Sequence, residues 1–272
     1  MLIFVTINQI SPALSDSRVH CPLQQIRKSV GLGSPPETEV VNRLSEDLSA
    51  FVAKEGRLPS ASSSVPEERL SARVLEMGIR LPGFVVHLSP HAKSLIRDFR
   101  PRPSKRTDFS VVRMQSAFLG EDEGKDILSP VSKKWIHFET KYLRTETERA
   151  PYRLIARDGK IYGADGKPFD TSGAELKGLS NSTGRAMLVM DQHGSLYAMK
   201  DQVRGLLHHT TLLGGEPVAF AGEIIVKEGI LTLIGNKAGH YHTPTSYFAQ
   251  LLEQLDLMGV NVRKPRLEIF GD

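Results

Sequence analysis

The spacing of apolar residues predicts helices at both ends of the chain. Apolar side chains recur every three or four residues over 38–55, 67–78 and 245–258, which indicates amphipathic helices. Pro66 stands before the second helix and Gly78 at its end, and Gly259 follows the third, so each of these residues is a helix boundary signal.

From Trp135 onward, short β-type runs alternate with turns that contain glycine. Asp158-Gly159 separates two such runs, a strong signal for a β-hairpin. Further strands are expected over 186–190, 195–198, 219–226, 230–234 and 266–270. The pattern predicts an α+β fold, with a β-rich C-terminal domain closed by one helix and a helical N-terminal region.

Changes in composition predict three parts. Residues 1–66 contain Ser/Pro/Gly clusters and are expected to be a loose secretion or linker region, interrupted by the first helix. Residues 67–134 are expected to be a helical extension, and residues 135–272 the α+β domain. The N-terminus lacks the features of a cleavable secretory signal, so we expect a reducing, cytosol-like environment or secretion by a signal-independent route.

Composition narrows the class of protein. The 272 residues are 40% hydrophobic and 24% charged, which is ordinary globular usage, and no run of ~20 apolar residues suggests a membrane span. The lone cysteine, Cys21, excludes an internal disulfide and Cys-based zinc sites. The net charge of +4 comes partly from a basic segment over 91–113. That segment fits an anionic partner or a solvated loop, but it has too few aromatic residues to predict nucleic-acid binding.

Four of the nine histidines lie in two neighbouring strings, His208-His209-Thr210-Thr211 and Gly239-His240-Tyr241-His242. One hypothesis is a metal site: on a strand, His240 and His242 would share a face, with His208 or His209 and Glu223 completing the ligands. A second is a nucleophilic triad using Ser246, Thr210 or Thr211, although no G-x-S-x-G elbow is present. Neither spacing matches an established motif, so we predict no metal.

The third hypothesis is ADP-ribosyl transfer from NAD. This chemistry needs an Arg or His that holds the dinucleotide, a short Ser/Thr strand that braces the site, and a Glu that stabilises the cation-like ribose. Arg153, Thr210 and Glu223 occur in that order. The alternative interpretation of the three is an exposed strand arginine, a strand threonine and a surface glutamate.

The stretch from Gly205 to Pro244 resembles the core of the plant IQ-motif-containing calmodulin-binding (IQM) proteins. Their pattern is roughly F-x-H-S-S-F-L-x-G-G-x-x-x-x-A-G, then D-G-I-L, then S-G-H-Y-x-P. This chain has LHHTTLLGG from Leu207, AG at Ala221, EGIL from Glu228 and AGHYHTP from Ala238. The resemblance covers about Tyr152 to Val262. The chain has no I-Q-x-x-x-R-G motif, so calmodulin binding is not carried over.

Related bacterial effector-like proteins extend the resemblance to effector mono-ADP-ribosyltransferases that modify a threonine of host ubiquitin. That match rests on the order of Arg153, Thr210 and Glu223, and the plant pattern often has Arg at the position of Glu223. It implies an ADP-ribosyltransferase-like fold, NAD as substrate, ubiquitin as a host acceptor and no metal. Arg153 would bind NAD, Thr210 would brace the site and Glu223 would be catalytic, while His209 and Tyr241 would contact the dinucleotide.

The leading prediction is therefore a bacterial toxin-like virulence effector that is secreted into the host cytosol and transfers ADP-ribose from NAD to a host protein. The alternative is a non-catalytic protein-binding module that shares the plant IQM core. In that case the histidine and threonine strings only shape the fold.

Overall fold

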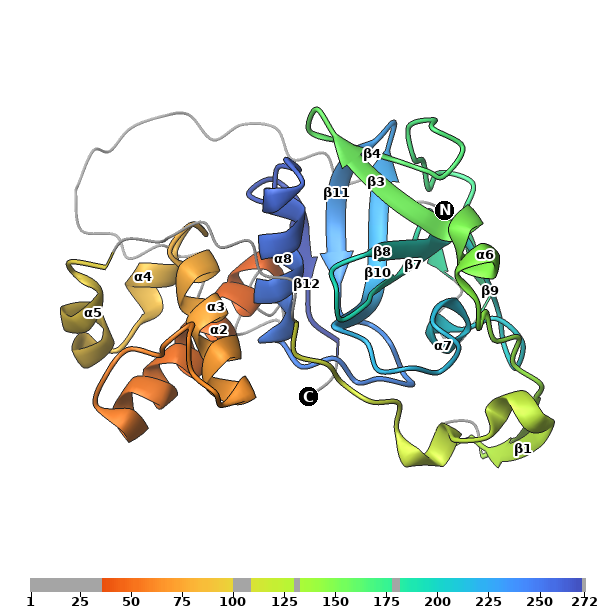
Figure 1. Ribbon diagram of the computed structural model, residues 1–272, viewed down its shortest axis with the longest axis horizontal. Helices are drawn as coiled ribbons and strands as arrows, with labels where there is room; N and C mark the ends of the chain where they lie inside the picture. The colour runs from red at the N-terminus through yellow and green to blue at the C-terminus, as the bar shows by residue number, and fades with distance from the viewer. Residues whose placement is uncertain (1–35, 100–108, 130–132, 178–181, 271–272) are drawn as a thin grey trace, which may run out of the picture. The chain divides into compact units, whose positions relative to one another are not determined.

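A computed structural model describes residues 36–99, 109–129, 133–177 and 182–270, and these described residues belong to one compact unit (Figure 1). Cys21 and most of the predicted loose region lie outside the described residues. No helix in the described ranges is both long enough and apolar enough to cross a membrane.

Four helices open the described chain: α2 (Pro36–Glu55), α3 (Pro66–Gly78), α4 (Phe84–His87) and α5 (Pro90–Ile96). The first two confirm the helices expected from apolar spacing. Gly78 is the last residue of α3 and Ile79 is its C-cap, so the glycine is needed for packing and not for capping. A Cβ on Gly78 would lie 2.3 Å from the Phe84 ring, which packs directly on α3.

The main sheet has seven strands in the order β12-β11-β10-β7-β8-β3-β4. Neighbours are antiparallel except β11 and β12, which run parallel and are connected through α8 (Tyr247–Leu257). The strands are β3 (Arg153–Arg157), β4 (Lys160–Tyr162), β7 (Ala186–Met190), β8 (Leu196–Met199), β10 (Phe220–Lys227), β11 (Ile230–Gly235) and β12 (Arg266–Glu268). These strands and α8 confirm the predicted α+β class.

Two hairpin turns have both central residues at positive φ: the predicted one at Asp158-Gly159, and one at Glu228-Gly229 between the predicted strands 219–226 and 230–234. The angles are 51° and 74° at Asp158-Gly159, and 49° and 82° at Glu228-Gly229. Positive φ at both positions is the type I′ geometry, which matches the right-handed twist of the flanking strands. Asp-Gly and Glu-Gly thus join β3 to β4 and β10 to β11.

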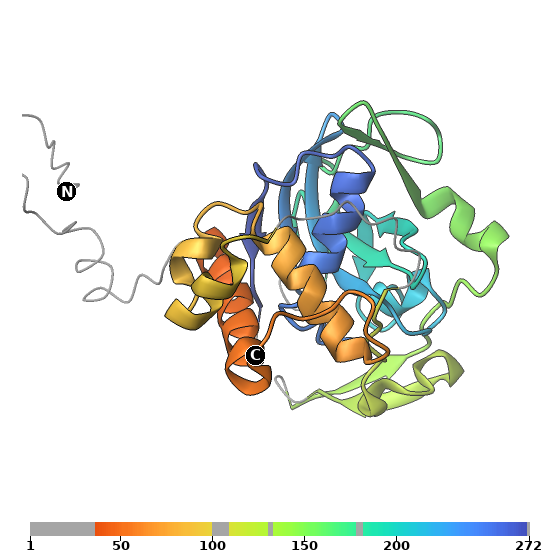
Figure 2. The same ribbon diagram turned by 60° about the vertical axis from the view of Figure 1, so that its left-hand side comes forward.

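Alternating side chains on the sheet form two hydrophobic clusters. Leu188, Met190 and Ile224 point to the face covered by α8, where α2 and α3 also contribute apolar side chains (Figures 1 and 2). Met187 and Val189 point to the opposite face, which Leu212 of α7 (His209–Leu212) covers. All five residues of β7 are buried because both faces of the sheet are covered.

The remaining elements surround the second face. A small sheet has the strand order β6 (Ser182–Thr183), β5 (Glu175–Lys177), β9 (Asp201–Val203). The short helices are η1 (Ser116–Phe118), η2 (Glu121–Glu123), α6 (Glu146–Arg149) and η3 (Ala150–Tyr152). A separate antiparallel hairpin consists of β1 (Lys125–Leu128) and β2 (Trp135–Phe138), and apolar spacing did not predict β1.

Candidate functional site

The two histidine strings meet in the interior, on the face of the sheet that α7 covers. Thr210 and Thr211 lie in α7, so the prediction that the threonine pair is on a strand is wrong. His208, the N-cap of this helical turn, donates its backbone N–H to the Thr211 hydroxyl (3.0 Å). A side chain that bonds the N-cap backbone favours a helix start, which explains the local conformation.

A fully buried carboxyl, Glu121 of η2, is the centre of this interior cluster. It accepts hydrogen bonds from the hydroxyls of Thr210 (2.6 Å) and Tyr142 (3.1 Å). Its second oxygen lies 2.9 Å from Nε2 of His240, an ion-pair distance without hydrogen-bond geometry. Glu121 therefore connects η2, the segment after β2, α7 and the loop after β11.

Aromatic rings pack around His240, the neighbour of this carboxyl. The His240 ring centroid lies 4.1 Å from that of Phe118 and 4.7 Å from that of His208, and Phe138 lies 5.4 Å from His208. Nε2 of His208 accepts the Gly205 backbone N–H (2.8 Å). Burial lowers the pKa of His208 to about 3, and the nearby His240 adds to the effect.

Two of the three residues predicted to contact NAD, His209 and Tyr241, are buried and bonded to the backbone. Nε2 of His209 is 2.8 Å from the Gly222 carbonyl oxygen, and burial lowers the pKa of this histidine to about 4. A neutral ring donates through Nε2, so it holds α7 against β10. The Tyr241 hydroxyl donates to the Glu216 carbonyl (2.8 Å).

Glu223 lies on β10 with only 3% of its surface exposed. The Glu223 carboxylate is 3.3 Å from the Arg185 guanidinium and 3.9 Å from the Lys237 ammonium. Arg185 also forms an ion pair with Glu268 (2.8 Å). Burial raises the pKa of Glu223, while the charges of Lys237 and Arg185 oppose that rise. The interpretation of Glu223 as a surface residue is wrong, since this glutamate is a buried member of an ion-pair network.

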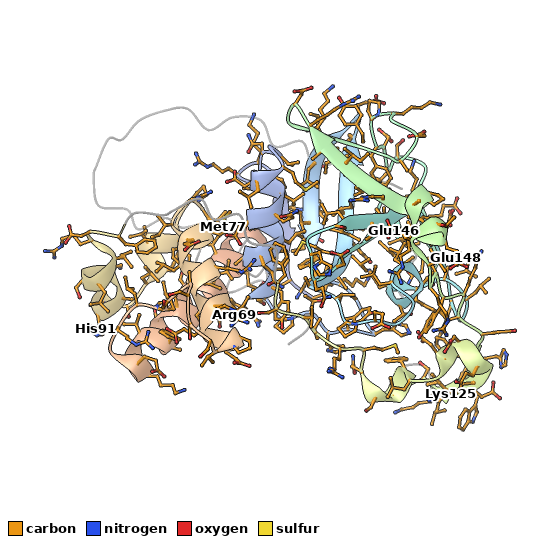
Figure 3. The ribbon with its side chains drawn as sticks, in the orientation of Figure 1. Arg69, Met77, His91, Lys125, Glu146 and Glu148 are labelled. Carbon is orange, nitrogen blue, oxygen red and sulfur yellow. The ribbon has the colours of Figure 1, made fainter. Side chains whose placement is uncertain are left out.

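Arg153 is exposed on β3, near the edge of the sheet, and its guanidinium is 3.7 Å from Glu146 of α6 (labelled in Figure 3). Strand register places Arg153 of β3 in one row across the sheet with Tyr197 of β8, Val189 of β7 and Ala221 of β10. Arg153 is therefore three strands away from β10, the strand that carries Glu223. At ~4.8 Å between strands and ~3.3 Å between residues, the Cα atoms of Arg153 and Glu223 are roughly 16 Å apart.

Arg153, Thr210 and Glu223 therefore belong to separate sets of contacts. The partner of Arg153 is Glu146, that of Thr210 is Glu121, and those of Glu223 are Arg185 and Lys237. The contacts differ for the three residues, and the roles assigned to them at one site stay predictions.

The metal and triad hypotheses also depend on where the structure places the predicted ligands and nucleophiles. His240 lies in a turn and His242 has φ of +44°, so the two do not share the face of a strand. No group of three or more His, Cys, Asp or Glu in the described ranges could hold a metal ion. The hydroxyls proposed as nucleophiles at Thr210 and Thr211 are both bonded inside the fold.

Sequence reasoning missed the residues that organise both networks. Glu121 lies in the acidic run Glu-Asp-Glu, and Arg185 follows a glycine, so neither has a motif or periodicity that marks it. Their partners are distant along the chain, 89 residues for Glu121 and Thr210 and 83 for Arg185 and Glu268. Only the tertiary fold identifies such pairs.

Comparison with known proteins confirms the resemblance of the core to plant IQM proteins. Residues 148–248 match the family model described as IQ motif-containing protein middle domain. Two similar proteins of Arabidopsis thaliana are IQ domain-containing protein IQM2, 28% identical over 109 residues, and IQM1, 26% identical over 115. The matches cover 40% and 42% of this chain but 17% and 22% of the relatives. No solved structure matches the chain at a significant level.

These relatives contradict the prediction of a bacterial toxin-like effector that ADP-ribosylates a host protein. They are plant IQ domain-containing proteins, and they favour the alternative, a non-catalytic binding module. Nothing in them supports an ADP-ribosyltransferase fold or ubiquitin as an acceptor. Enzymatic activity, the use of NAD and secretion stay predictions, as do the domain boundaries at 66 and 134.

Proposed function

We propose that the chain is a non-catalytic protein-binding module built around a middle domain of the IQM type. One observation carries the proposal: four polar side chains of the family-like strings form hydrogen bonds inside the fold. Those of His209, Tyr241 and Thr243 bond to backbone groups, and that of Thr210 bonds to Glu121. Residues used in this way stabilise loops and are not available to a substrate.

Thr243 illustrates how the second string supports the sheet. Its hydroxyl donates to the Ala221 carbonyl (2.9 Å) and accepts the Ala221 N–H (3.2 Å), replacing a strand partner at that position of β10. The neighbouring Asn236 donates its side-chain amide to the Thr243 carbonyl (2.9 Å). Buried polar groups with such partners stabilise one conformation of a loop.

The proposal is tested with a purified partner. A photo-reactive amino acid on the exposed surface captures candidate proteins from native cells, and each candidate is purified and titrated by calorimetry. We expect one saturable site whose affinity is unchanged by NAD and by Arg153→Gln, because the proposed module does not use NAD and the ion pair of the exposed Arg153 with Glu146 is long (3.7 Å).

Two results would overturn the proposal. One is that no purified candidate binds the folded protein saturably. The other is that incubation with NAD labelled on its adenylate transfers label to a protein and Glu223→Gln, confirmed as folded by circular dichroism, abolishes that transfer.

A further inference from the structure

We infer that the outward face of the β1–β2 hairpin is the docking surface for an acidic, extended segment of the partner protein. This inference rests on the proposed function, and it names the surface and the chemistry of the partner. The hairpin projects at the lower edge of the molecule in both ribbon views, and Lys125 marks it in Figure 3.

Strand register places two large apolar side chains opposite each other on this face. Leu128 pairs with Trp135, and these residues are 46% and 70% exposed. Asp126 pairs with His137 on the same face, where the carboxylate and the imidazole are 3.0 Å apart. An exposed tryptophan beside a leucine is typical of the anchor positions of protein interfaces.

The opposite face of the hairpin is held by the body of the protein. Phe138 is buried and packs against the His208 ring. The Glu139 N–H donates to the Gly205 carbonyl (3.0 Å), and a Cβ on Gly205 would lie 2.4 Å from the His137 carbonyl oxygen. Because the hairpin is fixed in this way, its outward face is already ordered before a partner binds, which lowers the entropic cost of association.

Two exposed lysines indicate the sign of the charge expected on the partner segment. Lys133 and Lys134 lie in the turn that leads into Trp135, and both are exposed. Neither forms an ion pair with any carboxylate in the described ranges. Unpaired ammonium groups next to an apolar anchor favour a segment that alternates acidic and apolar residues.

The geometry favours a peptide over an anionic membrane surface. An anionic membrane would cover the whole face, including the Asp126 carboxyl, which is 66% exposed. A short segment can instead bind at Leu128 and Trp135 with its acidic residues beside Lys133 and Lys134 and away from Asp126. The hairpin is a separate two-stranded sheet, and Gly205 lies against the β2 backbone at His137, so the strand edge offered to an extended backbone is the outer edge of β1, with which no described strand pairs. Two apolar side chains form a small patch that suits a few anchor residues.

The fluorescence of Trp135 can report binding, because Trp135 is the only tryptophan of the chain. The probe is a short synthetic peptide in which glutamate alternates with leucine, titrated into the whole protein. We expect the Trp135 emission to shift to shorter wavelength with saturation, and binding to weaken as salt is added. A peptide with lysine in place of glutamate should cause no shift.

Matched charge-reversal variants locate the site. We expect Lys133→Glu/Lys134→Glu to weaken peptide binding by tenfold or more. The control is Arg263→Glu/Lys264→Glu, another adjacent pair of exposed basic residues, and it should bind like the parent protein. Thermal unfolding would confirm that both variants are folded.

Three outcomes overturn the inference: no emission shift with the acidic peptide, equal weakening in both double variants, or a shift with phosphatidylserine vesicles but not with the peptide. If a purified natural partner binds and both double variants bind it equally, the docking surface is wrong while the proposed function stands. If no natural partner binds, the proposed function is what fails.

Discussion

At the scale of single residues, one buried carboxyl holds together four segments that are distant in sequence. Glu121 is bonded to Thr210 and Tyr142 and lies beside His240. Removing one member of such a buried network leaves its partners without bonds, and each unsatisfied group costs about 1–3 kcal/mol.

We therefore expect Glu121→Ala to lower the free energy of unfolding by about 3–5 kcal/mol. The measurement is urea unfolding followed by circular dichroism. Glu123→Ala is the matched control, because Glu123 is exposed in the same short helix, and it should change stability by about 0.5 kcal/mol or less. Equal effects of the two substitutions would show that Glu121 does not connect these segments.

At the scale of elements, the hairpins follow from local sequence. Asp158-Gly159 and Glu228-Gly229 each provide two residues at positive φ, and both turns lie between short runs of β-type residues. Strand lengths and turn positions were therefore accessible without tertiary information. β1 was not, because Lys-Asp-Ile-Leu is too short and too polar to show a period.

The two turn glycines provide a graded prediction about these hairpins. A Cβ on Gly159 would come no closer than 3.7 Å to other atoms, whereas on Gly229 it would lie 3.0 Å from the Ile161 carbonyl oxygen. In both alanine variants a residue with a Cβ must adopt a positive φ, which lowers the free energy of unfolding by about 1–2 kcal/mol. Only Gly229→Ala adds a clash with the backbone.

We expect Gly229→Ala to lower the unfolding midpoint in urea clearly more than Gly159→Ala does. If Gly159→Ala were the more destabilising of the two, the close approach of the β10–β11 turn to β4 would be wrong.

At the scale of the whole molecule, buried histidines make the stability of the fold depend on pH. The pKa values of His208 and His209 are lowered to about 3 and 4, mainly by burial. In the unfolded chain both would titrate near their ordinary value of 6.5. Between these limits the unfolded chain binds more protons, so the free energy of unfolding falls as pH decreases.

We expect each histidine to contribute a slope that approaches about 1.4 kcal/mol per pH unit below pH ~6. His209→Gln tests this, because the glutamine amide can replace the Nε2–H donor without titrating. Urea unfolding between pH ~7 and ~5 should show a shallower loss of stability in the variant. Parallel pH profiles would contradict the assignment of a low pKa to His209.

The helical layer is the other feature that belongs to the whole molecule. The family-like region, 148–248, ends within α8, yet α8 packs against α3, and Arg73 of α3 forms a buried ion pair with Glu253 (2.9 Å). Neither the pairing of α3 with α8 nor that of β12 with β11 can be read from the sequence, because the partners are separated by long stretches of chain.

The sequence by itself determined the α+β class, the long helices, the Asp158-Gly159 hairpin and the resemblance to the IQM core, because these depend on local periodicity, turn chemistry and short motifs. Only the tertiary structure decided that Arg153, Thr210 and Glu223 lie in separate networks, that Glu121 is the interior partner of Thr210, and that Trp135 is exposed. The physical reason is that burial and long-range pairing depend on which segments pack together, and the order of three residue types along a chain does not determine whether they meet in space.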